Sequence, residues 1–457
     1  MARHLCRCTL LIAFLFTLLR CSSINALVNS KIDRIIDLST QLVKITERIY
    51  IEEENVGTYK IVIEPSHKDR LAYIDATINS QSLDLVHKDD GSYEVDLTGK
   101  SPKPLVVTKI FTKLLEPYPR EIKQNERQFV RYQGSLTTLS PYPSSTVTTK
   151  IKLPQGARLE SFTKASKMTT GTNKLTYGPF KDVQPNQAEP LSIHCENNTP
   201  FIAVTHLLRT IEVSPWTQSI SVVNQVKVVH VGAKLSGPFS RIDYQRDHSN
   251  GLSAVRSLNV ELPKTASDIF FRDGIGNIST SSVRYTTGKT QVNIKPRFPL
   301  FGGWATDFSL GYRVPIKEFL NEPKSGNNYR LSVPLSDVLY DSMFIEDAEV
   351  RVTLPAGANN VEIKGAIEIE RQNDELNYSY LDVIGRPVVI LRKKNVVAQH
   401  TEGKPVVIRF DYSKVYMAQE PLLLMAAAII TLILAALYSR LSSKSPNHAG
   451  VNKIKED

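Results

Sequence analysis

The feature that most constrains this chain is an uncharged apolar stretch near its C-terminus. Nineteen residues from Pro421 to Ser439 carry no charge, and Glu420 and Arg440 close the stretch on either side. A helix rises ~1.5 Å per residue, so ~20 apolar residues cross the hydrocarbon core of a bilayer. The alternative, a core helix of a soluble protein, normally shows a polar stripe, and this stretch has almost none. We therefore predict one transmembrane helix at 417–439, the form in which a lone segment satisfies its backbone hydrogen bonds in lipid.

The charges that follow the stretch indicate its orientation. The tail, 440–457, holds four basic and two acidic residues. Basic residues next to a span favour the cytoplasmic side. We therefore expect a short cytoplasmic tail, with the residues before the span on the opposite side of the membrane.

The N-terminus has the pattern of an export signal. Arg3 and Arg7 precede an apolar run at 10–19, and small residues follow it. This order is typical of a cleaved signal peptide, and ten apolar residues are too few to span a bilayer. We predict a signal peptide at 1–26, and so a type I membrane protein. Cleavage is expected after Ala26, with Ser23 as the alternative.

The formal net charge of +10 does not indicate a nucleic-acid-binding protein. Half of it belongs to the predicted signal peptide and the tail, and residues 27–439 keep +5 from 49 basic and 44 acidic residues. That balance is an ordinary mixed surface without a basic stripe. We expect no nucleic-acid partner.

Cysteine usage excludes a disulfide-stabilised body. Cys195 is the one cysteine after the predicted cleavage site, and a single thiol cannot form an internal disulfide. Hydrophobic cores must therefore hold the body together. His194 could serve Cys195 as a base, but successive side chains of a strand point to opposite faces. A buried or partner-facing thiol is the favoured interpretation.

Short runs of alternating β-branched and polar residues recur along the body and end in Pro, Gly, Asn or Asp. Such runs predict strands. We expect short helices in only two places, Leu105–Leu115 and the region of Phe319. Many short strands with frequent turns favour antiparallel β-sandwiches. The strand-like runs begin at Ile32, Tyr59, Val147, Phe201, Ile220, Ser282, Val361 and Arg386.

An internal echo suggests two such sandwiches. Leu153–Ala157 (LPQGA) matches Leu354–Ala358 (LPAGA) at an offset of 201, and Leu175–Tyr177 matches Leu376–Tyr378 at the same offset. Chance similarity is the alternative. A repeat of this length lies within the size range of a single domain.

The predicted fold class is therefore mainly β. Two tandem antiparallel β-sandwich domains, 27–205 and 206–413, face the lumen and precede a single transmembrane helix.

Three Asn-x-Ser/Thr triplets lie on the expected lumenal side, at Asn197, Asn277 and Asn377. Each is a possible N-glycosylation acceptor. Pro200 weakens the first triplet as an acceptor, whereas Asn277 lies in a turn-like segment and is the best candidate.

Enzyme signatures are largely missing. The sequence lacks the metalloprotease, serine-hydrolase and Cys/His metal motifs. Adjacent acids at Asp89–Asp90 and Asp374–Glu375 lie in polar turn contexts and are expected in solvated loops. We predict no catalytic, cofactor-binding or metal-binding residues.

Three segments combine aromatic residues, arginine and turn residues: 237–246 (GPFSRIDYQR), 270–277 (FFRDGIGN) and 296–304 (PRFPLFGGW). Such a mixture suits either a protein-binding surface or a tightly specified corner of a sandwich. Both interpretations remain open.

These segments, together with 381–387 (LDVIGRP) and 419–423 (QEPLL), resemble the ribophorin I family, the first subunit of the eukaryotic oligosaccharyltransferase. The resemblance runs over about 27–438. It implies a type I protein of the endoplasmic reticulum membrane with two tandem lumenal sandwiches and one span. The partners it implies are the multispanning catalytic subunit and a small membrane subunit.

The resemblance also implies that the chain is not the catalyst. The catalytic subunit of that complex carries a W-W-D type motif and many spans, whereas Trp216 and Trp304 are far apart here and one span is expected. The complex transfers a preassembled glycan from dolichyl diphosphate to the Asn of a sequon. For this subunit we expect support of the complex and presentation of nascent polypeptides, without a cofactor.

The expected tail departs from animal members of the family, which extend past the span with a segment associated with ribosome docking. Direct ribosome docking is therefore doubtful here. Lys453 and Lys455 fit the K-x-K-x-x retrieval signal of resident membrane proteins. A plain solvated tail is the alternative. Two other function classes remain in view: a single-span cell-surface adhesion or receptor protein, and an independent lumenal hydrolase or transferase.

Overall fold

The computed structural model confirms the mainly β prediction, with 51% of the described residues in strands and 12% in helices. The predicted signal peptide, Lys453 and Lys455 lie outside the described residues. The structure describes residues 27–53, 56–100, 104–246, 252–323, 326–337, 342–365, 368–378 and 382–442.

The first half of the chain is built on one eight-stranded sheet. Its strands in spatial order are β14 (Met168–Gly171), β15 (Lys174–Val183), β12 (Ser144–Lys152), β1 (Asn29–Asp37), β2 (Val43–Ile51), β8 (Leu105–Phe111), β4 (Leu71–Ile78) and β5 (Gln81–Leu83). β1 pairs with β12 in parallel and with β2 antiparallel. Apolar residues alternate along these strands, which gives the sheet a buried face.

Two smaller sheets cover that face. Buried residues of β1 and β2 share one core with the four-stranded sheet and a second core with the three-stranded sheet. The four-stranded sheet consists of β13 (Leu159–Phe162), β16 (Pro190–Glu196), β11 (Phe129–Ser135) and β9 (Glu116–Pro117). The three-stranded sheet consists of β3 (Thr58–Ile61), β7 (Tyr93–Asp96) and β6 (Leu85–His87), and η1 (Pro65–Arg70) leads into β4.

The second half has the same plan around one continuous core. Its large sheet, called sheet E below, consists of β21 (Ser267–Arg272), β24 (Ala305–Pro315), β18 (Ser219–His230), β17 (Ile202–Ser214), β27 (Phe344–Thr353), β31 (Arg386–Val397) and β29 (Glu370–Arg371), with β30 (Glu375–Asn377) also on β31. The covering strands are β28 (Asn359–Lys364), β32 (Val406–Asp411), β26 (Asn328–Val333) and β25 (Leu320–Asn321), and β22 (Ser282–Tyr285), β23 (Lys289–Ile294) and β20 (Leu258–Pro263).

The two halves share one topology. In each, the first strand forms an antiparallel hairpin with the second (β1–β2, β17–β18) and a parallel pair with a strand far along the chain (β1–β12, β17–β27). The LPQGA and LPAGA echoes follow β12 and β27, and in both turns the alanine N–H donates to the proline carbonyl, at 3.2 Å and 3.1 Å. The other sequence match is not equivalent: Leu175–Tyr177 lies in β15, whereas Leu376–Tyr378 begins in β30.

The position of β17, the first strand of sheet E along the chain, helps to place the junction between the halves. β17 begins at Ile202, so a junction at 205/206 would cut a strand that belongs to the second half. We keep the division into two tandem domains as a proposal and place its junction between β16 and β17.

Leu105–Leu115 was expected to hold a helix, and that prediction was wrong. Leu105–Phe111 forms β8, where β-branched residues alternate between the core and the opposite face. The region of Phe319 holds one short 3-10 turn, η2 (Ile316–Glu318), before β25.

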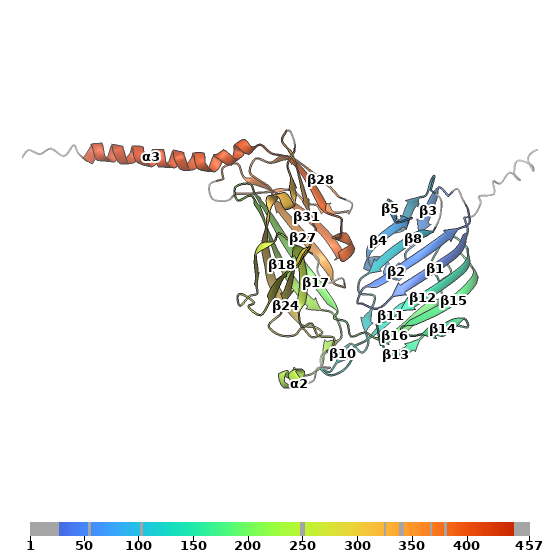
Figure 1. The fold of residues 1–457 in the computed structure, drawn as a ribbon. Helices are drawn as coiled ribbons and strands as arrows, with labels where there is room; N and C mark the ends of the chain where they lie inside the picture. The colour runs from blue at the N-terminus through green and yellow to red at the C-terminus, as the bar shows by residue number, and fades with distance from the viewer. Residues whose placement is uncertain are drawn as a thin grey trace, which may run out of the picture.

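A single helix in the described residues is long and apolar enough to cross a membrane. α3 (Gln419–Ser442) follows the 3-10 turn η4 (Lys414–Ala418), and none of its 24 residues is buried. Figure 1 shows α3 extending away from the strands of the second half. Its position agrees with the span predicted at 417–439.

The halves meet where central strands of each large sheet begin or end. Leu42 and Ile110 of the first half share a buried apolar cluster with Ala203, Phe344 and Val397 of the second. A short parallel pair joins β10 (Glu121–Ile122) to β19 (Lys234–Leu235) nearby. The 3-10 turn η3 (Ala398–His400) lies at this contact, and α2 (Arg241–Arg246) follows β19.

Candidate functional site

The aromatic segments 237–246 and 296–304 pack against each other. Phe239 lies 5.6 Å from Trp304 and 5.5 Å from Phe301, measured between ring centroids, and Tyr244 lies 5.9 Å from Phe301. The ring of Phe298, which is exposed to solvent, lies with its centroid 5.7 Å from that of Trp304. The rings meet tilted or edge to face, the arrangement that aromatic pairs favour.

This aromatic cluster is fastened to the joint between the halves. A Cβ atom on Gly302 would lie 1.8 Å from the carbonyl oxygen of Ala233, so no other residue fits there without a backbone shift. The N–H of Leu235 donates to the carbonyl of Gly302 at 3.1 Å, next to the β10–β19 pair. Of the two open interpretations, the packing supports a specified corner for these two segments.

The third segment, 270–277, forms a rigid turn at the end of β21. Arg297 binds the carboxylate of Asp273 through two nitrogens, one of them at 2.9 Å. The same carboxylate accepts the N–H groups of Ile275 and Gly276 at 2.9 and 3.0 Å. The hydrogen bond from Arg297 holds the pKa of Asp273 well below its usual range. Ile275, at the tip of the turn, is 81% exposed.

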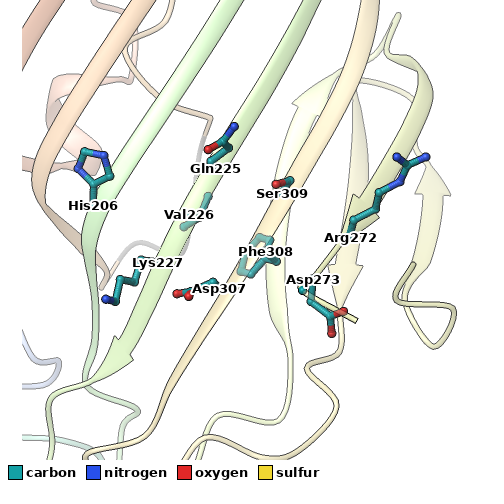
Figure 2. A pocket seen from close by; sticks show the side chains of 10 residues that line it. His206, Gln225, Val226, Lys227, Arg272, Asp273, Asp307, Phe308 and Ser309 are labelled. Carbon is teal, nitrogen blue, oxygen red and sulfur yellow. The ribbon is translucent and has the colours of Figure 1, made fainter. Parts of the chain in front are cut away.

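A groove runs beside this turn across the face of sheet E that lies opposite the core. Residues directly across from one another in the strand register form a charged row: His206 on β17, Lys227 on β18 and Asp307 on β24. Asp347 extends the row, with its carboxylate 3.6 Å from Nδ1 of His206. Figure 2 shows His206, Lys227 and Asp307 on neighbouring strands. Arg272 and Asp273 lie at the far edge of the view.

The groove has a volume of about 400 Å³ and adjoins a second hollow of about 490 Å³. The two share Lys227, Asp273 and Asp307, and the second adds the apolar side chains of Ile275 and Phe298. Together they form one open surface, called the outer groove below. Its apolar and charged side chains stand next to one another.

The outer groove is suited to binding more than to chemistry. His206, Lys227 and Asp307 are exposed, so water screens their charges and contacts with them are individually weak. No group of three or more His, Cys, Asp or Glu side chains is placed to hold a metal ion in the described part of the chain.

Cys195 is buried, as the sequence predicts. It lies in β16 with 1% of its surface exposed, and burial raises the pKa of its thiol to about 12. His194 points to the opposite face, where its Nε2 lies 2.9 Å from the carbonyl oxygen of Tyr118. The two residues therefore do not form a nucleophile and base.

Two of the three candidate acceptor asparagines are exposed. Asn277 follows the Asp273 turn, and its amide oxygen accepts a hydrogen bond from Nε of Arg272 at 2.9 Å. This bond engages the oxygen and not the nitrogen to which a glycan attaches. Asn377 is exposed in β30, while Ser379 of its triplet lies outside the described residues.

Asn197 has a different environment. It is fully buried, and its amide nitrogen donates to the carbonyls of Leu38 and Thr40 at 3.2 and 3.4 Å. Its amide oxygen accepts from the hydroxyl of Thr199 at 2.6 Å. The Asn-x-Thr pattern here builds an Asx turn that packs the junction between the halves. Glycosylation of all three asparagines stays a prediction.

Sequence reasoning singled out two segments that line part of the outer groove, 270–277 and 296–304, but not its charged row. His206, Lys227 and Asp307 lie about 20 and 80 residues apart along the chain, and only the strand register brings them together. The one signal for the charged row was a polar residue at alternate positions of apolar strands, which marks a solvent-facing side but not a site.

Comparison with known proteins gives one consistent result. The family model described as Ribophorin I matches residues 27–439. Dolichyl-diphosphooligosaccharide–protein glycosyltransferase subunit 1 of Caenorhabditis elegans is 37% identical over 425 residues, which cover 90% of this chain and 72% of the relative. Subunit 1A of Arabidopsis thaliana is 34% identical and covers 96% of this chain and 75% of its own.

Solved structures align far less well. An M1 zinc metallopeptidase from Deinococcus radiodurans aligns with a TM-score of 0.26 at 13% identity, over 46% of this chain and 42% of its own. Values this low support no argument about the present chain.

Proposed function

Because this chain belongs to the ribophorin I family, we propose that it is a non-catalytic subunit of the oligosaccharyltransferase. That complex transfers a preassembled glycan from dolichyl diphosphate to asparagine in Asn-x-Ser/Thr sequons. The observation that carries the proposal is the match of nearly the whole chain to relatives named subunit 1 of this glycosyltransferase in a nematode and in plants.

The structure supports a role in assembly more than in chemistry. Cys195 is buried with a raised pKa, and the charged side chains of the outer groove are exposed to water. The fold instead offers two β-rich halves and one apolar helix. In this proposal the chain lies in the endoplasmic reticulum membrane, with α3 as its anchor and its β-rich part in the lumen.

Copurification tests the assignment. An affinity-tagged full chain is isolated from microsomes in mild detergent, and its partners are identified by mass spectrometry. We expect the multispanning catalytic subunit and the other membrane subunits in near-equal amounts. A control chain with another single span and the same tag should bring down none of them. Purification of the tagged chain alone would contradict the proposal.

Sequon occupancy tests the orientation. If the body is lumenal, Asn277→Gln and Asn377→Gln each remove one glycan, and each shifts the mobility of the full chain by one step. Asn197→Gln is the informative comparison, because the folded chain encloses that nitrogen. In sealed microsomes, added protease should trim only the C-terminal tail. Loss of the body to protease would reverse the orientation.

The outer groove is the place where we propose that a nascent polypeptide contacts this subunit. Its exposed charged row and the apolar Ile275 and Phe298 suit an extended chain of mixed composition. Charge reversal of Lys227 and Asp307 tests this, with Glu362→Lys on β28 as an exposed control outside the groove.

The readout is glycosylation of an unfolded polypeptide by the purified complex. We expect the groove variant to raise KM a few-fold and to leave kcat nearly unchanged, because only binding of the acceptor weakens. An equal loss of kcat and kcat/KM would assign the groove to the chemistry instead, and no change would exclude it from acceptor binding.

A further inference from the structure

We propose that the corner of sheet E from which α3 departs is itself a membrane-contact surface that rests in the interfacial layer of the lipid bilayer. The surface, called the juxtamembrane corner below, consists of Trp216, Val383, Ile384, Val415 and Tyr416. The inference rests on α3 spanning the membrane and not on the identity of any protein partner.

The five side chains are apolar or aromatic and open to solvent. Val415 is 78% exposed, Val383 67%, Trp216 51%, Ile384 46% and Tyr416 39%. Exposed large apolar side chains gathered in one place mark an interaction surface. Tryptophan and tyrosine in particular are enriched where a protein meets the membrane–water interface.

Specific contacts hold this corner to the base of α3. The carboxylate of Asp382 accepts the N–H groups of Ile384 and Gly385 at 3.2 and 3.0 Å, and the side chain of Gln419 donates to the same oxygen at 3.3 Å. Gln419 is the first residue of α3. The turn that carries Val383 and Ile384 is therefore tied to the first helical turn of the span.

The neighbouring turns are held at the same level. Tyr416 packs over Gly357, where a Cβ atom would lie 2.5 Å from the ring. Arg386, directly after the Asp382 turn, donates to the carbonyls of Val213 and Leu354 at 2.8 and 3.3 Å. Val213 lies near the end of β17, just before the turn that exposes Trp216.

The chemistry of the corner sets its depth. The uncharged stretch begins at Pro421, and a helix rises only ~3 Å over the two residues from Gln419. The exposed side chains of Val383 and Ile384 lie beside this first turn of α3. They are therefore at the depth where the headgroup layer meets the acyl chains.

A second turn of the same construction lies at the opposite end of sheet E. Asp273 organises Ile275 and Gly276 as Asp382 organises Ile384 and Gly385. Ile275 is also exposed. A strand as long as β24 separates the two ends by on the order of 30 Å. The Asp273 turn is thus a matched control, alike in local structure and different in position.

The test compares labels at these two turns in the full chain. Ile384→Cys and Ile275→Cys are each labelled with a small fluorophore and reconstituted into nanodiscs of phosphatidylcholine and phosphatidylethanolamine. Cys195 is 1% exposed, so the unsubstituted chain gives the labelling blank. Equal thermal unfolding of both variants and the unsubstituted chain verifies the fold.

We expect nitroxide-bearing lipids to quench the label at position 384 several-fold more than the label at position 275. Iodide in the buffer should quench the label at position 275 several-fold more than the label at position 384. Equal access of iodide to both labels would overturn the inference. Protection of position 384 from iodide without quenching by lipid would also overturn it, since a protein would then cover the corner. Release of the chain from the membrane by alkaline carbonate would show that α3 does not span the bilayer. Both the membrane anchor of the proposed function and the juxtamembrane corner would then be excluded.

Discussion

Arg209 lies in the middle of the second half with none of its side chain exposed. One guanidinium nitrogen contacts Asp337 at 2.8 Å and Asn224 at 2.7 Å, and another donates to the hydroxyl of Tyr312 at 3.2 Å. Burial and then the Asp337 charge raise the pKa of Tyr312. The group acts as one network, because each member satisfies a polar atom that would otherwise be buried without a partner.

The first half carries a counterpart at the same place in its topology. Arg34 on β1 lies opposite Glu47 on β2 and donates to the carbonyl of Ser135 at 2.7 Å. Glu47 pairs with Lys109 on β8 at 2.8 Å. A buried arginine on the first strand of each half, in a network with the next two strands, supports the proposed duplication more strongly than the short sequence echoes.

Breaking the Arg209 network should be costly. Asp337→Ala leaves a buried guanidinium without its counter-charge, so we expect a loss of about 3–5 kcal/mol in the free energy of unfolding. Glu362→Ala, which removes an exposed partner of Lys364, should cost less than about 1 kcal/mol. Urea unfolding of the full chain in detergent measures both. Similar values for the two variants would contradict this account of the network.

At the scale of single elements, the two-residue strand β19 helps to connect the two halves of the chain. Its two residues pair with β10 of the first half on one side, and Lys234 bridges Gly302 on the other. The aromatic cluster packs beside it. A two-residue strand contributes few contacts of its own, so the joint depends on the close backbone approach that Gly302 allows.

A side chain at that position should therefore disturb the joint. In Gly302→Ala the new methyl group meets the carbonyl of Ala233, and we expect a loss of about 3 kcal/mol, the upper end of the range for overpacking. Gly288→Ala is the control, because no atom lies within 4 Å of its Cβ position. The midpoint of thermal unfolding reports both. A neutral Gly302→Ala would show that the joint can shift freely.

On the scale of the whole molecule, the contact between the halves contains a buried histidine. The ring of His400 packs edge-on against Tyr73 of the first half at 5.2 Å, and the hydroxyl of Tyr73 contacts Lys404 at 2.6 Å. Burial, together with the charges of Lys393 and Lys404, lowers the pKa of His400 to about 3. The folded chain thus keeps this ring neutral at pH values where the unfolded chain protonates it.

This difference predicts loss of stability in acid. The contribution of His400 is complete above its unfolded pKa of ~6.5 and declines as the pH falls toward the folded value, by about 2 kcal/mol at pH 5. In His400→Gln the side chain cannot titrate, so the difference in unfolding free energy between pH 7 and pH 5 should shrink. If His400→Gln showed the same difference in unfolding free energy between pH 7 and pH 5 as the unsubstituted chain, the lowered pKa of His400 would be contradicted.

Local sequence patterns correctly predicted the features of the fold that depend on neighbouring residues alone. The apolar composition of α3, the alternation along the strands and the opposite faces of His194 and Cys195 all follow from the backbone period. Leu105–Phe111 was mistaken for a possible helix because a short apolar run has no period that separates the two forms. Arg209 could not be predicted to be buried, since an arginine in a strand looks exposed until packing between distant strands encloses it. The charged row of the outer groove could not be predicted either, because only the register of three separate strands brings its residues together.

The parallel pairing in each large sheet has a consequence for biosynthesis. Asn29 of β1 lies opposite Ser144, and Ala203 of β17 lies opposite Phe344. One edge of each opening hairpin therefore has no neighbour until more than ninety further residues have been made. Contacts this distant along a chain form slowly, and an open strand edge invites the wrong neighbour meanwhile. During translation, each half therefore passes through a vulnerable interval that a chaperone is suited to cover, and the interval for the second half begins only after the first half can have closed.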